Sequence, residues 1–241
     1  MKILTLNTWT EKGPWRERWK IILNAVRDFQ PDIILFQEIF NREWAEEVRK
    51  ITNYPSLVYL SESEISGLAV LAKFPVMGSG SFKLKTQSPS SEPRRFLLFT
   101  ELQAADSGVT VFNTHLTWRL NEGEIRCAQV DEILQAIEEK SSKKVIVCGD
   151  FNSAPDTPEL RKMTAAGFTD TYEVLNPGGN ELTWDNRNPY AASASIDLPD
   201  RRIDFIFSRG FAAPKASKVV LNKPDQNGIF ASDHYGILTV F

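Results

Sequence analysis

The sequence predicts an α+β fold in which two β-sheets pack face to face and helices cover the outside of the pair. Short apolar runs typical of buried strands recur from one end of the chain to the other, and helical repeats separate several of them. Polar residues follow many of the strand ends. With 241 residues, of which 42% are hydrophobic, the chain can bury a large core, and we expect a single domain spanning residues 1–241.

The first half of the chain begins with a strand at 3–6 and a helix at 14–29, where apolar residues recur at helical spacing after Pro14. A second apolar strand at 33–36 precedes an amphipathic helix at 41–51. Further strands are expected at 66–72, 81–85 and 95–102, with a Ser/Pro-rich loop at 87–93. We expect these last strands to form a β meander.

The second half alternates strands with one long helix. Strands are expected at 109–113, 145–148, 202–207 and 237–241. The long helix precedes the second of these strands and carries Val130, Ile133, Leu134 and Ile137 on one face. The stretch from 167 to 200 is rich in Gly, Asn, Pro and Asp, so long loops that shape a cleft are expected there.

The bulk composition excludes several classes of protein. A net charge of −3 and a pI near 5.6 give no positive field that would attract nucleic acid or anionic lipid, although nucleic acid is not excluded as a partner. No secretory signal or transmembrane run is apparent, and Cys127 and Cys148 form neither a disulfide framework nor a metal motif. We expect a cytoplasmic monomer.

The stretch 145–153 places two polar residues at the end of a buried strand. Four apolar residues run into Gly149-Asp150-Phe151-Asn152. Because side chains two residues apart in an extended segment lie on the same side, Asp150 and Asn152 can point into one site. The alternative is an Asx turn that caps a helix near 156–160, and this stretch alone does not decide between the two.

Polar residues recur at such strand ends along the whole chain. They are Asn7, Glu38, His115, Asp150, Asn152, Asp204, Asp233 and His234. Carboxylates that converge on one site repel each other unless a cation joins them, and oxygen ligands suit Mg²⁺ or Mn²⁺ better than Zn²⁺. The pattern therefore predicts a hard divalent cation, which suits phosphoester hydrolysis because it neutralises charge in the transition state.

The protein has two histidines, His115 and His234, and both lie in these positions. A lone histidine is more often a hydrogen-bonded structural residue, but the pair together favours a catalytic role. Asp204 can hold His234 in one tautomer and raise its basicity.

Seven short segments match, in order, the motifs of the endonuclease/exonuclease/phosphatase superfamily. They are Leu6-Asn7-Thr8-Trp9, Gln37-Glu38, Ser66-Gly67-Leu68-Ala69-Val70-Leu71, Asn113-Thr114-His115-Leu116, Gly149-Asp150-Phe151-Asn152, Arg202-Ile203-Asp204-Phe205-Ile206 and Ser232-Asp233-His234. Each is short, but their order along the whole chain is specific. The chain resembles this superfamily, which includes deoxyribonucleases, sphingomyelinases, inositol-polyphosphate 5-phosphatases and deadenylases.

The resemblance implies a four-layer α/β/β/α sandwich of two mixed sheets flanked by helices, with the site at one lip of the sheets. It implies that Glu38 is the principal metal ligand, helped by Asn7. Asp233, and conceivably Asp150, would lie near the same metal or a second one.

The same resemblance assigns roles in the chemistry. Asp150 and Asn152 would orient the attacking water and the phosphate, and His234, paired with Asp204, would contact the phosphate. The superfamily's mechanisms leave open whether Asp150 or His234 is the general base.

The Asn-Thr-His-Leu segment around His115 is similar to the sphingomyelinase, 5-phosphatase and deoxyribonuclease branches, whereas abasic-site endonucleases usually carry a tyrosine there. An imidazolium at His115 would stabilise or protonate the leaving oxygen. Membrane sphingomyelin is disfavoured as a substrate because the chain has no aromatic-rich hairpin for membrane insertion.

Three further residues are candidates for substrate contact. Trp118 and Trp184 fall in expected loops near the motifs, where aromatic rings can stack on a base or sugar, and Arg94 can reach a phosphate. Packing at the sandwich edge and a solvated strand-edge charge are the alternatives for these residues.

The sequence thus predicts a Mg²⁺-dependent phosphoesterase that uses direct attack of water, with a phosphodiester of nucleic-acid or lipid-headgroup type as the first choice of substrate. A small-molecule phosphomonoester, such as an inositol phosphate, is the second. From another class, a scaffold protein that keeps the sandwich without its chemistry is the rival, although every expected polar position is filled.

Overall fold

Two six-stranded β-sheets form the centre of the molecule in the computed structural model, which describes residues 1–90, 93–104, 107–194 and 198–241. The first sheet has the order β11 (Ala216–Val220), β12 (Gly236–Val240), β1 (Lys2–Asn7), β2 (Ile33–Gln37), β4 (Ser66–Ala72) and β3 (Ser56–Ser63). The second has the order β5 (Val76–Lys83), β6 (Phe96–Ala104), β7 (Ser107–His115), β8 (Val145–Asp150), β10 (Asp204–Arg209) and β9 (Thr169–Asp170). Both sheets are mixed, because β1 pairs with β2 and β7 with β8 in parallel while the other pairs are antiparallel.

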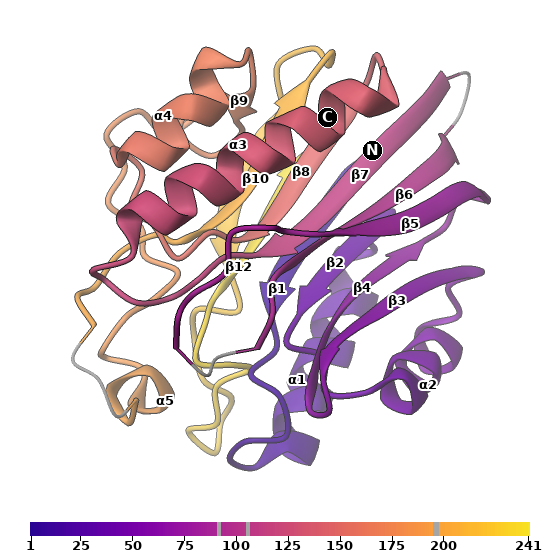
Figure 1. Ribbon diagram of the computed structural model, residues 1–241. Coiled ribbons are helices and arrows are strands. Elements are labelled where there is room, and N and C mark those ends of the chain that lie inside the picture. The colour runs from indigo at the N-terminus through magenta and orange to yellow at the C-terminus, as the bar shows by residue number, and fades with distance from the viewer. Residues whose placement is uncertain (91–92, 105–106, 195–197) are drawn as a thin grey trace.

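Helices cover the outer faces of both sheets (Figure 1). On the first sheet lie α1 (Trp15–Phe29) and α2 (Arg42–Thr52), and on the second lie α3 (Gly123–Lys140) and α4 (Pro158–Ala165). The short helix α5 (Pro189–Ala192) lies among the loops at one end of the sheets. The predicted four-layer α/β/β/α sandwich is confirmed.

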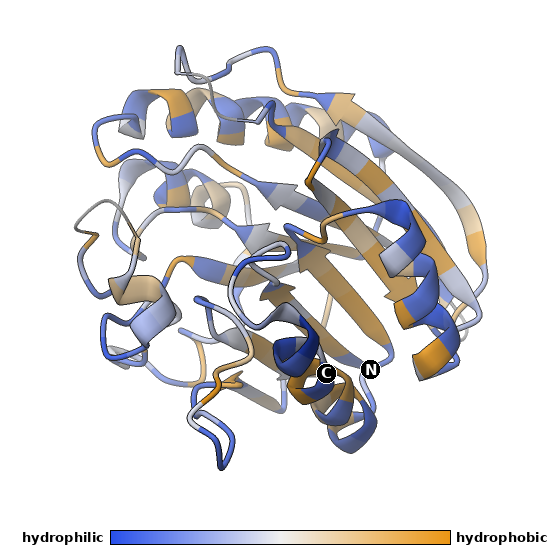
Figure 2. Ribbon diagram, turned by 90° about the horizontal axis from the view of Figure 1, so that it is seen from below, coloured by the Kyte–Doolittle hydropathy of each residue, from blue (hydrophilic) through white to orange (hydrophobic). Residues whose placement is uncertain are grey.

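Strand β2 shows why the central strands are continuous apolar runs. Its side chains alternate between two cores: Ile33 and Leu35 pack between the sheets, and Ile34 and Phe36 pack under the helices. A strand covered on both faces needs apolar residues at every position, not at every second one. Figure 2 shows the hydrophobic strands enclosed by more hydrophilic helix faces and loops.

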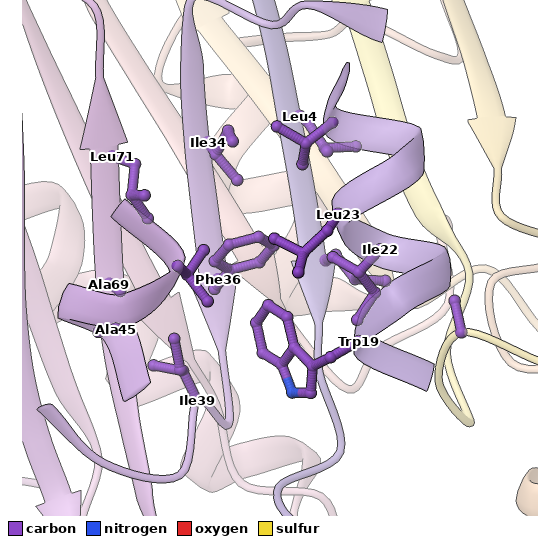
Figure 3. Close-up of a cluster of buried hydrophobic side chains, with 14 of the residues drawn as sticks. Leu4, Trp19, Ile22, Leu23, Ile34, Phe36, Ile39, Ala45, Ala69 and Leu71 are labelled. Atoms are coloured by element: carbon purple, nitrogen blue, oxygen red, sulfur yellow. The ribbon is translucent and has the colours of Figure 1, made fainter. Parts of the chain in front are cut away.

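Helix α1 illustrates the packing of the outer layer. Trp19, Ile22 and Val26 recur at helical spacing and are buried on the first sheet. The Trp19 ring meets the Phe36 ring edge to face, with centroids 5.5 Å apart (Figure 3). The helix ends at Gln30, which adopts a left-handed conformation with φ of 50° just before Pro31.

Some expectations need correction. The expected β meander is divided between the sheets, since β3 and β4 belong to the first sheet and β5, β6 and β7 to the second. The sequence also missed β3, β9 and β11, whose positions at sheet edges leave many of their side chains exposed or half-buried. Residues 91–92 and 195–197 of the expected loops lie outside the described residues. No described helix is long and apolar enough to cross a membrane.

Candidate active site

Strand register places three of the predicted residues side by side on the second sheet. His115 at the end of β7 is paired with Asp150 at the end of β8, and Asp150 is paired with Asp204, the first residue of β10. Directly paired residues on neighbouring strands point to the same face of a sheet. The second sheet therefore presents an imidazole and two carboxylates in one row.

The first sheet supplies the remaining residues from its own strand ends. Asn7 ends β1 and is paired with Gln37, which ends β2, so Glu38 follows directly. Asp233 and His234 immediately precede β12, which runs antiparallel to β1. The Asn7 amide donates to Oδ2 of Asp150 at 3.1 Å and thereby joins the two sheets.

The backbone at this end adopts conformations that most residues avoid. Gly149 has φ of 150°, and a Cβ there would lie 1.9 Å from the carbonyl oxygen of Thr114. Glu38 and Asn152 have φ of 54° and 53°, in the left-handed region. Such conformations cost about 1–3 kcal/mol each and gather at functional sites, where the surrounding structure holds them.

Asp150 is the hub of the hydrogen bonds. Its Oδ2 lies 3.4 Å from Nε2 of His115 and 3.6 Å from Nε2 of His234, and its Oδ1 accepts from the Asn152 backbone N–H at 2.9 Å. The last contact closes an Asx turn, and both Asp150 and Asn152 line the pocket described below. The turn does not cap α4, whose N-cap residue is Thr157.

His234 lies between two carboxylates. Its Nδ1 is 2.9 Å from Oδ2 of Asp204, and its Nε2 faces Asp150. Burial lowers the pKa of His234, but the charges of Asp204 and Asp150 outweigh burial and raise the pKa well above its usual value. The Trp184 ring packs edge to face on the imidazole, with centroids 5.1 Å apart.

Two aspartates carry costly buried charge. Burial raises the pKa of Asp150 to about 7, opposed by His234 and helped by Asp204. Burial also raises the pKa of Asp233 to about 6, opposed by His234 and helped by Glu38. The positive charge near both carboxylates does not outweigh the cost of burial, and a bound cation would lower that cost.

His115 differs from the sequence-based expectation of an imidazolium. Burial, and then the positive charges of Arg95 and His234, lower its pKa well below the usual value. The ring is therefore neutral at pH 7 and would assist a leaving oxygen as a hydrogen-bond donor.

A pocket of about 480 Å³ opens over these residues. Its polar floor is formed by Glu38, His115, Asp150, Asn152, Asp233 and His234. Trp118 and Trp184, the predicted aromatic candidates, also line it. Asn7 and Asp204 contact the floor residues from behind.

The structure places Arg95, and not the predicted Arg94, in the pocket. Arg95 is 2% exposed and lines the pocket, whereas Arg94 is exposed and lies outside the lining. Leu97 and Leu98 are both buried, so both faces of β6 are covered and alternation along the strand does not distinguish Arg95 from Arg94. Trp9 and Lys12 also line the pocket; Trp9 ends the first matched motif, but neither residue was selected as a candidate.

One group of potential metal ligands is already gathered among the residues that the structure describes. Single ligand atoms of Asp150, Asp204 and His234 lie within 4.8 Å of one another. Glu38 and Asp233 line the same pocket outside that group. The donor set around the pocket therefore consists mainly of oxygen atoms, which hard divalent cations prefer.

Comparison with known proteins agrees with this architecture. The model of the Endonuclease/Exonuclease/phosphatase family matches residues 4–234. The structure of D. rerio TDP2 complexed with single-strand DNA product superposes with a TM-score of 0.82 at 19% identity, over 99% of this chain and 97% of that one.

The chain spans only part of the length of the curated relatives that it matches. Protein angel of Drosophila melanogaster is 24% identical over 94% of this chain and 72% of its own length. The probable RNA exonuclease NGL3 of Saccharomyces cerevisiae is 24% identical over 68% of this chain and 40% of its own length. The chain spans 30% of the bovine protein angel homolog 2 and 48% of rat nocturnin.

Proposed function

Because the chain belongs to the Endonuclease/Exonuclease/phosphatase family, whose reaction is hydrolysis of phosphoester bonds, we propose that it is a Mg²⁺-dependent phosphodiesterase in which water attacks phosphorus directly. The row of His115, Asp150 and Asp204, joined by His234 at the floor of one pocket, carries this proposal. A fixed set of charged groups around a phosphate is most of what phosphoester hydrolysis requires from a protein.

Glu38, Asn7 and Asp233 would hold the metal. Glu38 and Asp233 line the pocket, and Asn7 lies at the adjoining strand end. Their oxygen atoms suit Mg²⁺, with Mn²⁺ as a substitute. A bound Mg²⁺ supplies a Lewis acid that offsets charge on the phosphoryl oxygens.

The chain's own residues would handle the phosphate and the proton. Asp204 fixes His234 through Nδ1, so Nε2 donates toward the pocket and can contact a phosphoryl oxygen. Asp150 and Asn152 would orient the attacking water, with the Asp150 carboxylate accepting its proton. His115 would donate a hydrogen bond to the leaving oxygen, and the neighbouring Arg95 would contact the phosphate.

A nucleic-acid phosphodiester is the preferred substrate class. NGL3 is named as a probable RNA exonuclease, and the TDP2 structure contains a single-strand DNA product. Trp118 and Trp184 in the pocket are suited to contact a base or sugar. A lipid-headgroup diester, as in the sphingomyelinase-like branch, is the second choice, and an inositol-phosphate-like monoester is the third.

A hydrolysis screen tests the proposal. The purified protein would be assayed with Mg²⁺, Mn²⁺ and EDTA, with Glu38→Gln as the blank. The substrates are bis-p-nitrophenyl phosphate, p-nitrophenyl phosphate, p-nitrophenylphosphorylcholine, single- and double-stranded DNA, RNA and an inositol polyphosphate. We expect metal-dependent turnover of diesters that disappears in the variant.

Other outcomes separate the rivals. Turnover restricted to p-nitrophenyl phosphate or the inositol polyphosphate would favour a phosphomonoesterase. Turnover that persists unchanged in Glu38→Gln would overturn the assignment of the metal ligand. No turnover, together with no Mg²⁺ binding in a calorimetric titration, would favour the inactive scaffold.

A further inference from the structure

One side of the pocket is aromatic and is not used by the proposed chemistry. Trp9, from the loop after β1, stacks on Tyr190 of α5, with ring centroids 4.8 Å apart and planes inclined by 26°. Both residues line the pocket and both are half-buried. Here this pair is called the aromatic wall.

The loop that carries Trp9 is held against its local preferences. Trp9 and Thr10 have φ of 56° and 45°, two consecutive left-handed residues that are not glycine. Thr10 is β-branched, a type that rarely adopts this region. A loop free to relax would not keep this bend, so the surrounding structure must hold it.

Arg18 of α1 supplies that restraint. Its side chain is 0% exposed, and all five of its N–H donors bind main-chain carbonyls. The acceptors are Lys12 at 3.1 Å, Thr8 at 2.9 Å, Ala231 at 3.0 Å, Trp9 at 3.2 Å and Thr10 at 2.8 Å. Because Ala231 directly precedes Ser232-Asp233-His234, Arg18 fixes the Trp9 loop relative to the segment that carries Asp233 and His234.

The charge around the aromatic wall discriminates between ligands. Aromatic rings bind both nucleobases, by stacking, and quaternary ammonium groups, by cation–π attraction. Here the guanidinium carbon of Arg18 lies 4.8 Å from the Trp9 ring centroid, and Lys12 lines the pocket beside it. Arg18 already holds the cation–π position at the Trp9 ring, and the carboxylates of Glu38 and Asp233 belong to the polar floor, so the aromatic wall itself suits an uncharged base better than a choline headgroup.

We propose that Trp9 and Tyr190 bind a nucleobase of the substrate and that Arg18 is the positioning residue that holds Trp9 in place. This inference rests on the proposed phosphodiesterase function and assigns the residues that bind the base of its preferred substrate. The base packs against the aromatic wall while its phosphodiester lies on the polar floor. The aromatic wall then determines specificity without taking part in bond cleavage.

Two diesters with the same leaving group test the inference. Thymidine 5′-(p-nitrophenyl phosphate) carries a base, whereas p-nitrophenylphosphorylcholine carries a cation and no ring. We expect Trp9→Leu to lower kcat/KM for the thymidine diester by about 5- to 100-fold, mainly through KM, and to leave the phosphorylcholine diester within about threefold. Tyr190→Leu should act in the same direction, and Tyr190→Phe, which keeps the ring, should resemble the wild type.

Several outcomes would overturn the inference. An equal loss on both diesters would make Trp9 a general structural residue. A selective loss on the phosphorylcholine diester would assign the aromatic wall to a cationic headgroup, and no loss on either would remove its role.

Direct binding keeps this test separate from the proposed function. If the wild type cleaves neither diester, the phosphodiesterase proposal fails, but titration with thymidine 5′-monophosphate still probes the aromatic wall. We expect Trp9→Leu to raise the dissociation constant by a similar factor of about 5 to 100. Equal dissociation constants, or no binding to the wild type at millimolar nucleotide, would contradict the inference.

Arg18→Lys tests the positioning role, with Arg27→Lys on the exposed side of the same helix as its control. Lysine has three donors in place of five, so the Trp9 loop should loosen. We expect a rise in KM for the thymidine diester that exceeds the rise for the phosphorylcholine diester, and no change in Arg27→Lys. Loss of thermal stability with unchanged substrate selectivity would reduce Arg18 to a structural residue. If Arg18→Lys does not fold, Thr10→Gly serves in its place, because glycine gives the loop more conformational freedom at this bend. It should give the same selective rise in KM, and unchanged selectivity there would overturn the role of the bend.

Discussion

The face of the first sheet under α1 and the pocket end of the two sheets are equally buried but differ in chemistry. Under α1, Trp19, Ile22 and Phe36 form an apolar cluster in which burial itself stabilises the fold (Figure 3). At the pocket end, Asp150, Asp204 and His234 are buried with charges that burial disfavours. The first region therefore stabilises the fold, whereas the second lowers the stability of the fold but holds reactive groups in place.

The two regions are adjacent along the same strands. Leu6 lies in the apolar cluster and Asn7 joins the pocket network; Phe36 lies in the cluster and Glu38 lines the pocket. A step of one or two residues thus changes the role of a side chain. Substitutions in the two regions should separate activity from stability, and four predictions test this contrast.

The largest effect is expected for His234→Ala on activity. Loss of the imidazole held by Asp204 should lower kcat for the best diester by about 10²- to 10⁴-fold. The melting temperature should stay near that of the wild type, because the variant also removes buried charge. Steady-state kinetics and calorimetry measure the two effects, and unfolding of the variant at room temperature would show that the pocket end stabilises the fold.

Trp19→Ala should give the opposite result. Removing this fully buried ring should lower the free energy of unfolding by about 3–5 kcal/mol. In urea unfolding, Lys20→Ala on the exposed face of α1 should stay within about 0.5 kcal/mol of the wild type. Below its melting temperature, Trp19→Ala should keep kcat within a few-fold, and a loss of kcat comparable to that of His234→Ala would show that the regions are coupled.

The contrast also explains what the sequence revealed. The apolar strands and the face of α1 were predictable because hydrophobic periodicity is local. Most of the polar strand ends were visible for the same reason, since Asn7, Glu38 and Asp150 follow apolar runs. Of the missed edge strands, β11 carries no long apolar run, whereas β3 contains the run Leu57-Val58-Tyr59-Leu60 and was overlooked.

Features that depend on the tertiary structure could not be predicted from local sequence patterns. Whether Arg94 or Arg95 enters the pocket depends on the register of β6, and the sequence-based choice was Arg94. The protonation of His115 depends on Arg95 and His234, which lie far away in the sequence. The contact between Trp9 and Tyr190 depends on Arg18, whose five acceptors are main-chain atoms that no side-chain pattern records.

The free energy of unfolding should depend on pH through Asp150 in a way that exposed carboxylates do not produce. In the folded protein Asp150 keeps its proton to about pH 7, whereas in the unfolded chain it loses the proton near its ordinary pKa of about 4. The unfolded state therefore releases protons first, and this residue's contribution to stability falls as pH rises from about 4 to 7.

Asp150→Asn removes this titration. In EDTA, the free energy of unfolding of the variant should rise relative to that of the wild type by about 3 kcal/mol between pH 4 and pH 7. Asp28→Asn, on the exposed face of α1, should run parallel to the wild type. Parallel curves for Asp150→Asn and the wild type would mean that the folded protein holds this carboxylate ionised without a metal.

A further effect on stability is expected at Glu62, which lies beside the pocket end and belongs to neither region. It is the one buried residue of β3 and sits where the register with β4 shifts between Ser61 and Ser63. Burial raises its pKa to about 8, opposed by Arg95 and helped by Glu38. A raised carboxyl pKa means that stability present below about pH 4 is lost progressively up to about pH 8.

Glu62→Gln should therefore be more stable than the wild type at pH 9, by about 4 kcal/mol, with the advantage shrinking as pH falls toward 4. The exposed neighbour Glu64→Gln is the matched control and should show no such trend. Urea unfolding at several pH values in EDTA gives both curves. Glu62→Gln could instead prove less stable than the wild type at pH 9. That result would mean that Arg95 holds the Glu62 carboxylate ionised, and that the cost of buried charge is confined to the pocket and does not reach the edge of the first sheet.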